Sequence, residues 1–258
     1  MQRGRLWRFG VDVVAWAARH YRVGELPVVL DGEPAYRDDT EHGEMARTAT
    51  DELARVGVLG RRGLDPDFAD LLAVLCRPQL EYYGWFAAEG RTVGMLSAVL
   101  GQMAVVAVRD GDAVTFREIR PSEVLGVLVS ELPPHRPAGF TPINTRMADL
   151  AAAGAGDSSG GPQMLQRPVS TVMPAEMRLL VEIATGKRSG SGQFFVAMRD
   201  AMGRRRVSPE PLGVVDTPRG RVLLTITHAR GERWVLVAPA TAADLVTRLR
   251  QMSSQLGG

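Results

Sequence analysis

Hydrophobic positions along the chain repeat with two periods, one typical of helices and one typical of strands. Helical stripes follow Pro66 and Pro174, and Asp65 before the first proline is a suitable N-cap. The apolar positions are Phe68, Leu71, Leu72 and Leu75 in the first stripe, and Met177, Leu180, Ile183 and Ala184 in the second. We therefore predict a helix after each proline.

Each predicted helix precedes a group of four strand-like runs. The runs of the first group are Leu80–Ala88, Val93–Leu100, Met103–Val108 and Val114–Ile119. The runs of the second group are Gln193–Met198, Leu212–Val215, Arg221–Thr227 and Arg233–Ala238. Both groups have the form of a meander, which predicts antiparallel pairing within each group.

The last two runs of each group meet at matching turns around Gly111 and Gly231, where glycine can supply a positive φ. Superposing these two glycines aligns two closing helices, with Leu125 on Leu245 and Val129 on Leu249. Thr241, followed three residues later by Asp244, is a cap signal for the second closing helix. The second half of the chain thus repeats the first.

The order helix, meander, helix, repeated once, predicts an α+β protein with a central antiparallel β-sheet and a pseudo-twofold internal repeat. We place the half-repeats at about residues 64–132 and 173–253 of a single domain spanning 1–258. Earlier helices are expected around Trp7 to Ala18 and Glu44 to Val56. The glycine- and serine-rich segment at about 154–168 is predicted to be a flexible linker, because it has little apolar surface to bury.

Two segments could indicate a signal peptide or a membrane-spanning helix, and the sequence of each argues against it. Arg8 and Asp12 interrupt the apolar region that a signal peptide needs after its basic start. The charge-free run from Thr92 to Val108 is shorter than the ~20 residues of a membrane-spanning helix, and Gly101 suits a turn between two strands. We therefore expect a cytoplasmic protein without stable membrane insertion.

The amino-acid composition excludes several classes of protein and of site. The chain is 45% hydrophobic and 23% charged, which argues against wholesale disorder. Its single cysteine, Cys76, excludes a disulfide scaffold and any multi-cysteine metal site. The four histidines are scattered without ligand spacing, so we expect no metal and no other cofactor.

No catalytic motif is present in the sequence. The segment from Gly186 to Gly192 resembles a phosphate-binding loop, but Val181 stands where that motif needs its first glycine, and Arg188 replaces the hydroxyl residue. Cys76 follows Leu75 on an apolar helix, which is typical of a core residue, although Arg77 could lower its pKa. We expect that the protein is not an enzyme.

Arginine clusters suggest the main alternative function, a nucleic-acid-binding regulator. The clusters are Arg61-Arg62 and Arg204-Arg205-Arg206. The net charge is only +2, and binding to nucleic acid needs a wide positive face with interleaved aromatic residues. A solvated hairpin tip explains the triple arginine more simply, so we expect no nucleic acid as a partner.

Large apolar residues occur on both faces of the predicted strands, whereas a sheet with one wet face alternates apolar and polar residues. The protein's own helices are the simpler cover for the second face, and a bound partner is the alternative. For a partner we select aromatic and aliphatic residues on that face with arginines at the rim, as at binding hot spots. The candidates are Trp85, Phe195, Leu223 and Val235, with Arg221 and Arg248 at the rim.

Several blocks of the sequence together resemble one protein family. They are the runs Leu71–Pro78, Gly190–Val196, Arg204–Pro209, Gly220–Leu223 and Trp234–Pro239, with Gly24–Leu30 near the start. Their order and spacing resemble the EspG family, the ESX (type VII) secretion-associated proteins of actinobacteria. The resemblance covers nearly the whole chain and implies a single EspG-like domain, with a central sheet and two helical bundles in a quasi-twofold arrangement.

The same resemblance implies an activity. Members of the EspG family are cytosolic chaperones that bind helical PE–PPE pairs and keep them soluble for export. The expected partner of this chain is therefore a helical secreted protein, either a PE–PPE pair or a related ESX substrate, which docks at the sheet and the C-terminal bundle. A homodimer is an oligomeric state left open.

Overall fold

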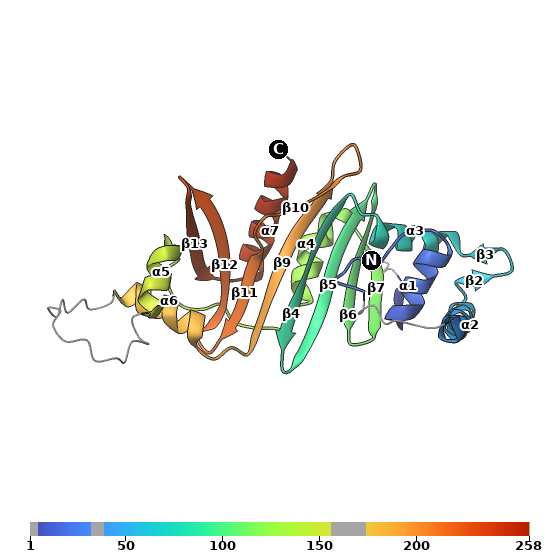
Figure 1. Cartoon of the computed structure of the whole chain (residues 1–258), viewed down its shortest axis with the longest axis horizontal. Coiled ribbons are helices and arrows are strands. Elements are labelled where there is room, and N and C mark those ends of the chain that lie inside the picture. Colours follow the sequence, from blue (N-terminus) through green and yellow to red (C-terminus); the bar gives the residue numbers. More distant parts are fainter. Residues whose placement is uncertain (1–4, 32–38, 156–173, 258) are drawn as a thin grey trace.

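The computed structural model describes residues 5–31, 39–155 and 174–257. Most of the predicted linker at 154–168 lies outside the described residues. The described chain is built around one large antiparallel sheet with helices on both faces (Figure 1). The α+β class and the antiparallel sheet are therefore as predicted.

The large sheet has eleven strands in the order β1-β7-β6-β5-β4-β9-β11-β12-β13-β8, with β10 paired to β9 off this path. The strands of its first part are β1 (Leu6–Gly10), β4 (Leu80–Ala88), β5 (Arg91–Leu100), β6 (Met103–Asp110) and β7 (Ala113–Ile119). Those of its second part are β8 (Ile143–Arg146), β9 (Gly190–Arg199), β10 (Arg205–Val207), β11 (Leu212–Thr217), β12 (Gly220–Ala229) and β13 (Glu232–Pro239). A separate ribbon pairs β2 (Leu59–Gly60) with β3 (Gly63–Leu64).

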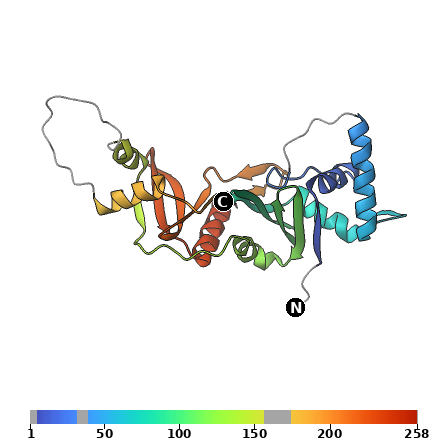
Figure 2. The same ribbon diagram turned by 90° about the horizontal axis from the view of Figure 1, so that it is seen from below.

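The helices divide between the two faces of the sheet. Their bounds are α1 (Val11–His20), α2 (Asp39–Val56), α3 (Pro66–Cys76), α4 (Val124–Ser130), α5 (Met147–Ala155), α6 (Ala175–Thr185) and α7 (Ala242–Gly257), with a short 3₁₀ turn at Pro121–Glu123. We call the face that carries α4 and α7 the back face, and the opposite one the front face. On the front face, α1 and α3 lie at one end and α5 and α6 at the other (Figures 1 and 2).

Three apolar cores match this division. The back-face core packs α4 and α7 against the strands and includes Phe86, Phe194 and Leu245. On the front face, one core joins α1 and α3 to β5, β6 and β7, and another joins α5 and α6 to β12 and β13. Because both faces bury apolar side chains, the strands lack a simple alternation of apolar and polar residues.

Local signals in the sequence explain where several elements begin and turn. The Asp65 side chain accepts a hydrogen bond from the Phe68 amide at 3.0 Å, which caps α3 as predicted. Thr241 and Asp244 form the predicted reciprocal cap of α7, since each side chain accepts from the other's backbone amide.

The central pair of strands, β4 and β9, approaches closely because glycines face large rings. Gly84 lies opposite Phe194, and Gly192 lies opposite Phe86. A Cβ atom on Gly84 would lie 2.1 Å from the Gln193 carbonyl oxygen, and one on Gly192 would lie 2.4 Å from the Trp85 carbonyl oxygen. These glycines let the backbones pair while the phenylalanine rings cover them.

Three local predictions were wrong. Trp7 lies in strand β1 rather than in the first helix, which begins at Val11. Arginines 205 and 206 form strand β10 instead of a loop tip, because the chain pairs with β9 again after the turn. Strand β9 begins at Gly190, three residues before the predicted run Gln193–Met198.

Candidate functional site

Among the described residues, no helix covers the middle of the front face (Figure 1), although the segment 24–31 crosses β5 there and brings the Val29 carbonyl against Gly94. Three aromatic side chains from β4 and β9 lie there, and we call them the aromatic ridge: Tyr83, Trp85 and Phe195. Tyr83 and Phe195 are cross-strand neighbours whose rings stack with centroids 5.7 Å apart. The Trp85 ring meets the Tyr83 ring edge-on at 6.2 Å. Tyr83 is buried, whereas Trp85 and Phe195 are only half-buried.

An apolar hollow of about 470 Å³ lies beside the ridge, toward the C-terminal half. Trp85 belongs to its wall, and β11 and β12 supply the far side through Val215, Leu224 and Ile226. The remaining lining residues are Ala87, Thr92, Arg188, Ser191, Gly192, Gln193, Pro211 and Gly213. Apolar side chains with a few polar groups are typical of a surface that receives another molecule.

A second hollow, of about 670 Å³ and more polar, lies on the other side of the ridge and is lined by Tyr83. Its buried Glu81 accepts a hydrogen bond from Arg205 Nε at 2.6 Å, and the Arg205 guanidinium lies 5.2 Å from the centre of the Tyr83 ring. Burial alone would lower the pKa of Arg205, but its hydrogen bonds to Glu81 and Tyr83 raise that pKa above the ordinary value. Arg205 is therefore a fixed cation at the base of the ridge.

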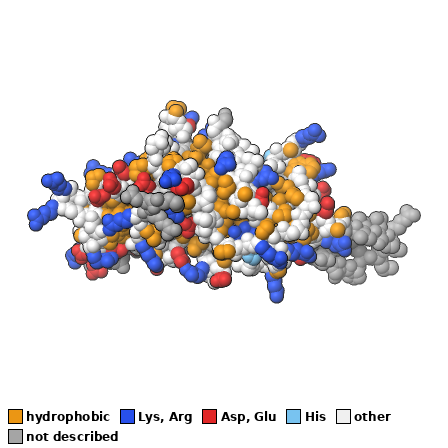
Figure 3. Space-filling view, turned by 180° about the vertical axis from the view of Figure 1, so that it is seen from behind, with side chains coloured by type: hydrophobic (Ala, Val, Ile, Leu, Met, Phe, Trp, Pro, Cys, Tyr) orange, Lys and Arg blue, Asp and Glu red, His pale blue; other side chains and the backbone are white. Residues whose placement is uncertain are grey.

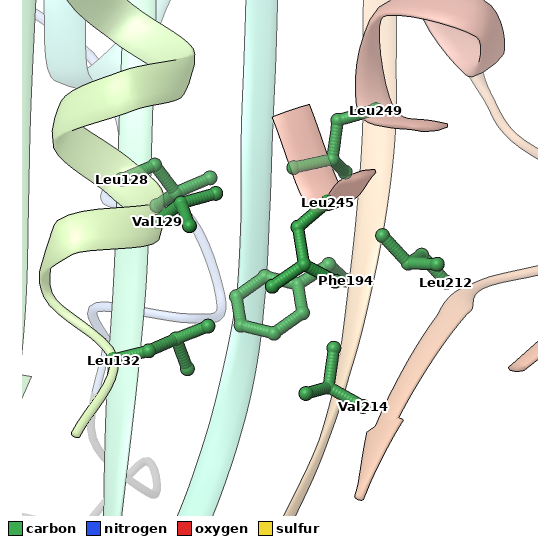
Figure 4. Close-up of a pocket in the computed structure, with 8 residues that line it drawn as sticks. All are labelled: Leu128, Val129, Leu132, Phe194, Leu212, Val214, Leu245 and Leu249. Atoms are coloured by element: carbon green, nitrogen blue, oxygen red, sulfur yellow. The ribbon is translucent and has the colours of Figure 1, made fainter. Parts of the chain in front are cut away.

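The back face closes its middle with the protein's own helices. Leucine and valine side chains of α4 and α7 converge on Phe194, leaving only a cavity of about 10 Å³ (Figure 4). Lysine and arginine side chains are interspersed with acidic ones over this side of the molecule (Figure 3). The centre of the back face is therefore closed, and its basic side chains form no continuous surface in this view. A hollow of about 500 Å³ opens beside α7 instead, between Arg248 and Met252 of the helix and residues 225–228 of β12.

The structure brings two of the six sequence-predicted residues together. Trp85 and Phe195 both belong to the aromatic ridge. Val235 is on the same face, but it is only 3% exposed because it packs in the core under α5 and α6. Leu223 is 2% exposed and belongs to the back-face core.

The two arginines expected at the rim lie elsewhere. Arg221 is 6% exposed and ion-paired to buried Asp216, with Nε and Oδ1 2.6 Å apart, and it also donates to the Pro133 carbonyl at 2.7 Å. It therefore fastens the segment after α4 to the sheet instead of lying at an exposed rim. Arg248 lies on α7, where it is half-buried and donates to Gln251.

Sequence reasoning missed Tyr83, Leu224 and Ile226. The signal for Tyr83 is present, because residues two apart on a strand share a face, and Tyr83 is two residues from Trp85. The choice of Leu223 over Leu224 depends on how β12 lines up with β4 across β9 and β11. That register is a property of the folded sheet.

The described residues contain little that suggests covalent or metal chemistry. Burial raises the pKa of Cys76 to about 12 despite the opposing effect of Arg77, so its thiol stays protonated at neutral pH. No cluster of three metal-ligating side chains occurs among the residues that the structure describes. Within the same ranges, no helix combines the length and hydropathy needed to cross a membrane.

Comparisons with known proteins match nearly the whole chain. The model of the EspG family matches residues 11–251. The ESX-3 secretion-associated protein EspG3 of Mycobacterium tuberculosis is 30% identical over 95% of this chain and 90% of its own length. The ESX-1 secretion-associated protein EspG1 of Mycobacterium marinum is 24% identical over 91% and 83%, respectively.

A solved structure shares the fold. The type VII secretion system chaperone EspG5 of Mycobacterium tuberculosis, determined in complex with a PE25–PPE41 dimer, superposes with a TM-score of 0.71. The match covers 95% of each chain at 15% sequence identity. The arrangement of sheet and helices is therefore common to proteins whose sequences have diverged widely.

Proposed function

Because this chain belongs to the EspG family, we propose that it is a cytosolic chaperone that binds helical ESX (type VII) substrates, such as PE–PPE-type pairs, and keeps them soluble for export. The chaperone with the shared fold, EspG5, was solved in complex with a PE25–PPE41 dimer. The observation that carries the proposal is the open middle of the front face, where an aromatic ridge lies beside an apolar hollow.

The occupant of this surface is the apolar end of a helical pair. Trp85 and Phe195 are half-buried in the free chain and would be covered fully by a partner. Aromatic side chains that become buried at the centre of an interface dominate binding energies. The hollow beside them, bounded by Leu224 and Ile226, is wide enough to receive side chains of a helix end.

The remaining candidates divide into supporting and peripheral positions. Val235 and Leu223 hold the front-face and back-face helices to the sheet, so they would affect binding through the fold. Arg221 fastens the connection after α4. Arg248 lines a different hollow, between α7 and β12, and is the candidate with least support.

The architecture around the surface is proposed to be a pseudo-twofold repeat within a single domain. Outward from the central β4–β9 pair, one half runs β4-β5-β6-β7-β1 and the other β9-β11-β12-β13-β8, and this equal order supports the repeat. In this arrangement, β1 and α1 of the first half correspond to β8 and α5 of the second half. Each proposed half-repeat then begins before the residue expected from the sequence, which was 64 for the first half and 173 for the second. The helices α1–α3 and α5–α6 are the proposed flanking bundles, and their separation leaves the surface open.

The nucleic-acid alternative gains no support from the arginine clusters. Arg204 is engaged by Asp200 at 2.8 Å, and Arg205 by Glu81 at 2.6 Å. Nucleic acid would compete with these carboxylates for both guanidiniums.

A homodimer is the oligomeric state that the sequence analysis did not decide, and it stays a prediction.

Affinity purification of the tagged chain from its native host, followed by mass spectrometry, tests the proposed function. We expect a helical pair of the PE–PPE or a related ESX type to co-purify, and the pair to aggregate when it is expressed without the chain. The same purification with the double variant Trp85→Ala/Phe195→Ala serves as the comparison. We expect this variant to retain its fold and to fail to co-purify the helical pair. Recovery of nucleic acid in place of a helical protein would refute the proposal.

A further inference from the structure

Two arginines face each other directly on the front face, next to the aromatic ridge. Arg199 on β9 is the cross-strand partner of Arg205 on β10. The Asp200 amide donates to the Arg204 carbonyl, and the Ser208 amide donates to the Val196 carbonyl. These two bonds show which cross-strand residue pairs are hydrogen-bonded to each other and which are not. Arg199 and Arg205 therefore form a non-hydrogen-bonded pair, in which side chains approach most closely. Like charges in that position destabilise a sheet.

Only one of these two arginines has a carboxylate partner. Arg205 pairs with Glu81, whereas no described carboxylate lies within 4 Å of the Arg199 guanidinium. One Arg199 nitrogen donates to the Gly203 carbonyl at 3.2 Å. Its Nε is buried without an acceptor, one of two such side-chain atoms among the described residues. A buried donor without an acceptor costs free energy. Because Nε is closed to solvent, an incoming acceptor would reach this guanidinium through its terminal nitrogens, which are not among the buried unpaired atoms.

The polar hollow contains more arginine side chains than carboxylates that are free to pair with them. The hollow is lined by Arg77, Arg199 and Arg205, and by two acidic residues. Glu81 is taken by Arg205, and Glu25 is taken by Arg19 at 2.6 Å. Arg77 contributes a second guanidinium, which donates to the backbone carbonyl of Arg22 at 2.9 Å.

We propose that this hollow binds an aspartate or glutamate side chain of the helical partner that docks on the aromatic ridge, with Arg199 as its main donor. The inference rests on the proposed function, because Tyr83 both lines this hollow and stacks on Phe195 of the ridge. A partner lying on the ridge would bring a neighbouring acidic residue within reach. Guanidinium groups bind carboxylates through two parallel hydrogen bonds, which fixes orientation as well as charge.

A protein carboxylate fits this hollow better than a nucleic-acid backbone does. Glu25 and Glu81 lie in the same hollow and would repel a chain of phosphates. A single carboxylate needs only one or two free guanidiniums, which is what Arg199 and Arg77 offer.

The test compares Arg199→Gln with Arg206→Gln, using the helical pair identified by the affinity purification. Arg206 is a matched control, because it lies on the same short strand as Arg205 and is paired with Met198, whose side chain packs on the back-face core. We expect Arg199→Gln to weaken binding at least about tenfold and to make the Kd less dependent on salt. Arg206→Gln should bind within about twofold of the wild type. Arg199→Lys, which keeps the charge without the planar fork, should fall between them.

A stability measurement separates a binding role from a structural one. Removing one of two facing like charges should leave the melting temperature of free Arg199→Gln unchanged or higher. A clear fall in melting temperature would make Arg199 a structural residue and overturn the inference. Wild-type affinity and salt dependence in Arg199→Gln would overturn it as well, and so would binding of a 20-nucleotide DNA strand that Arg199→Gln abolishes. If the wild type captures no helical pair, the proposed function itself has failed.

Discussion

The two faces of the sheet bury apolar side chains in different ways, and the neighbours Phe194 and Phe195 mark the difference. Phe194 points to the back face, is 3% exposed and is enclosed by side chains of α4 and α7 (Figure 4). Phe195 points to the front face, where it is half-buried, stacks on Tyr83 and packs at the edge of the core formed with α1 and α3. One strand thus presents the same side chain to a closed core and to an open surface.

This difference shows that apolar residues on both faces of a strand do not require cover on both faces. The helices of the front face are set at the two ends of the sheet, and each end has its own core. On the middle strands, Trp85 and Phe195 remain half-buried, next to the edge of the core that includes Tyr83 and Ala197. Such exposed apolar surface is uncommon on a monomer unless a partner covers it.

The largest effect is expected on the closed side. Phe194→Ala should lower the free energy of unfolding by about 3–5 kcal/mol, because it leaves a cavity among packed leucines and valines. Urea unfolding followed by circular dichroism would measure the change. A loss below about 1 kcal/mol would mean that the back-face core is loosely packed, and the contrast with Phe195 would fail.

A buried and an exposed arginine, Arg221 and Arg219, give a second comparison of this kind. Arg221→Met should cost about 3 kcal/mol, because it leaves the buried Asp216 carboxylate without its guanidinium. Arg219→Met is the control, since Arg219 and Glu182 form an exposed ion pair, and exposed pairs contribute little to stability. Equal melting temperatures for the two variants would contradict the structural role of Arg221.

On the open side, Phe195→Ala should cost only about 1–2 kcal/mol of stability, because the side chain is half-buried. Its main effect should be on binding, where loss of a hot-spot aromatic weakens affinity about ten- to a hundredfold. Isothermal titration with the helical pair, beside thermal melting, measures both. A stability loss as large as that of Phe194→Ala would make Phe195 a core residue and would remove it from the binding surface.

The smallest effect concerns the end of a helix that closes the back face. Hydrogen bonds from Thr241 lower the pKa of Asp244, so the cap stabilises α7 at neutral pH. This contribution is complete above the unfolded pKa of about 4 and is lost as the pH falls through the lowered folded value. Thr241→Ala should cost about 1 kcal/mol at pH 7 and less near pH 3. A cost that is the same at both pH values would show that the carboxylate does not contribute to the cap.

Local signals predicted much of the fold. Caps such as Asp65 and Thr241 and turns at Gly111 and Gly231 depend on neighbouring residues only, and all of them lie where expected. Strand β8 and helix α5 were not predicted, because β8 is four residues long and only its pairing with β13 defines it.

The site was less predictable than the fold. Trp85 and Phe195 could be selected from side-chain type and strand parity alone. Leu223 and Arg221 were misplaced, because their side of the sheet depends on a register set across four strands. The burial of Arg221 also depends on Asp216 and on a connection more than eighty residues away in sequence.

Hydroxyl-radical footprinting of the free chain and of its complex with the helical pair would show directly which face of the sheet the partner covers. We expect Trp85 and Phe195 to lose reactivity in the complex, while Met252 on α7 and Met202 at the β9–β10 turn keep theirs. Unchanged reactivity at Trp85 and Phe195, with protection of Met252 instead, would place the partner on the back face and refute docking on the aromatic ridge.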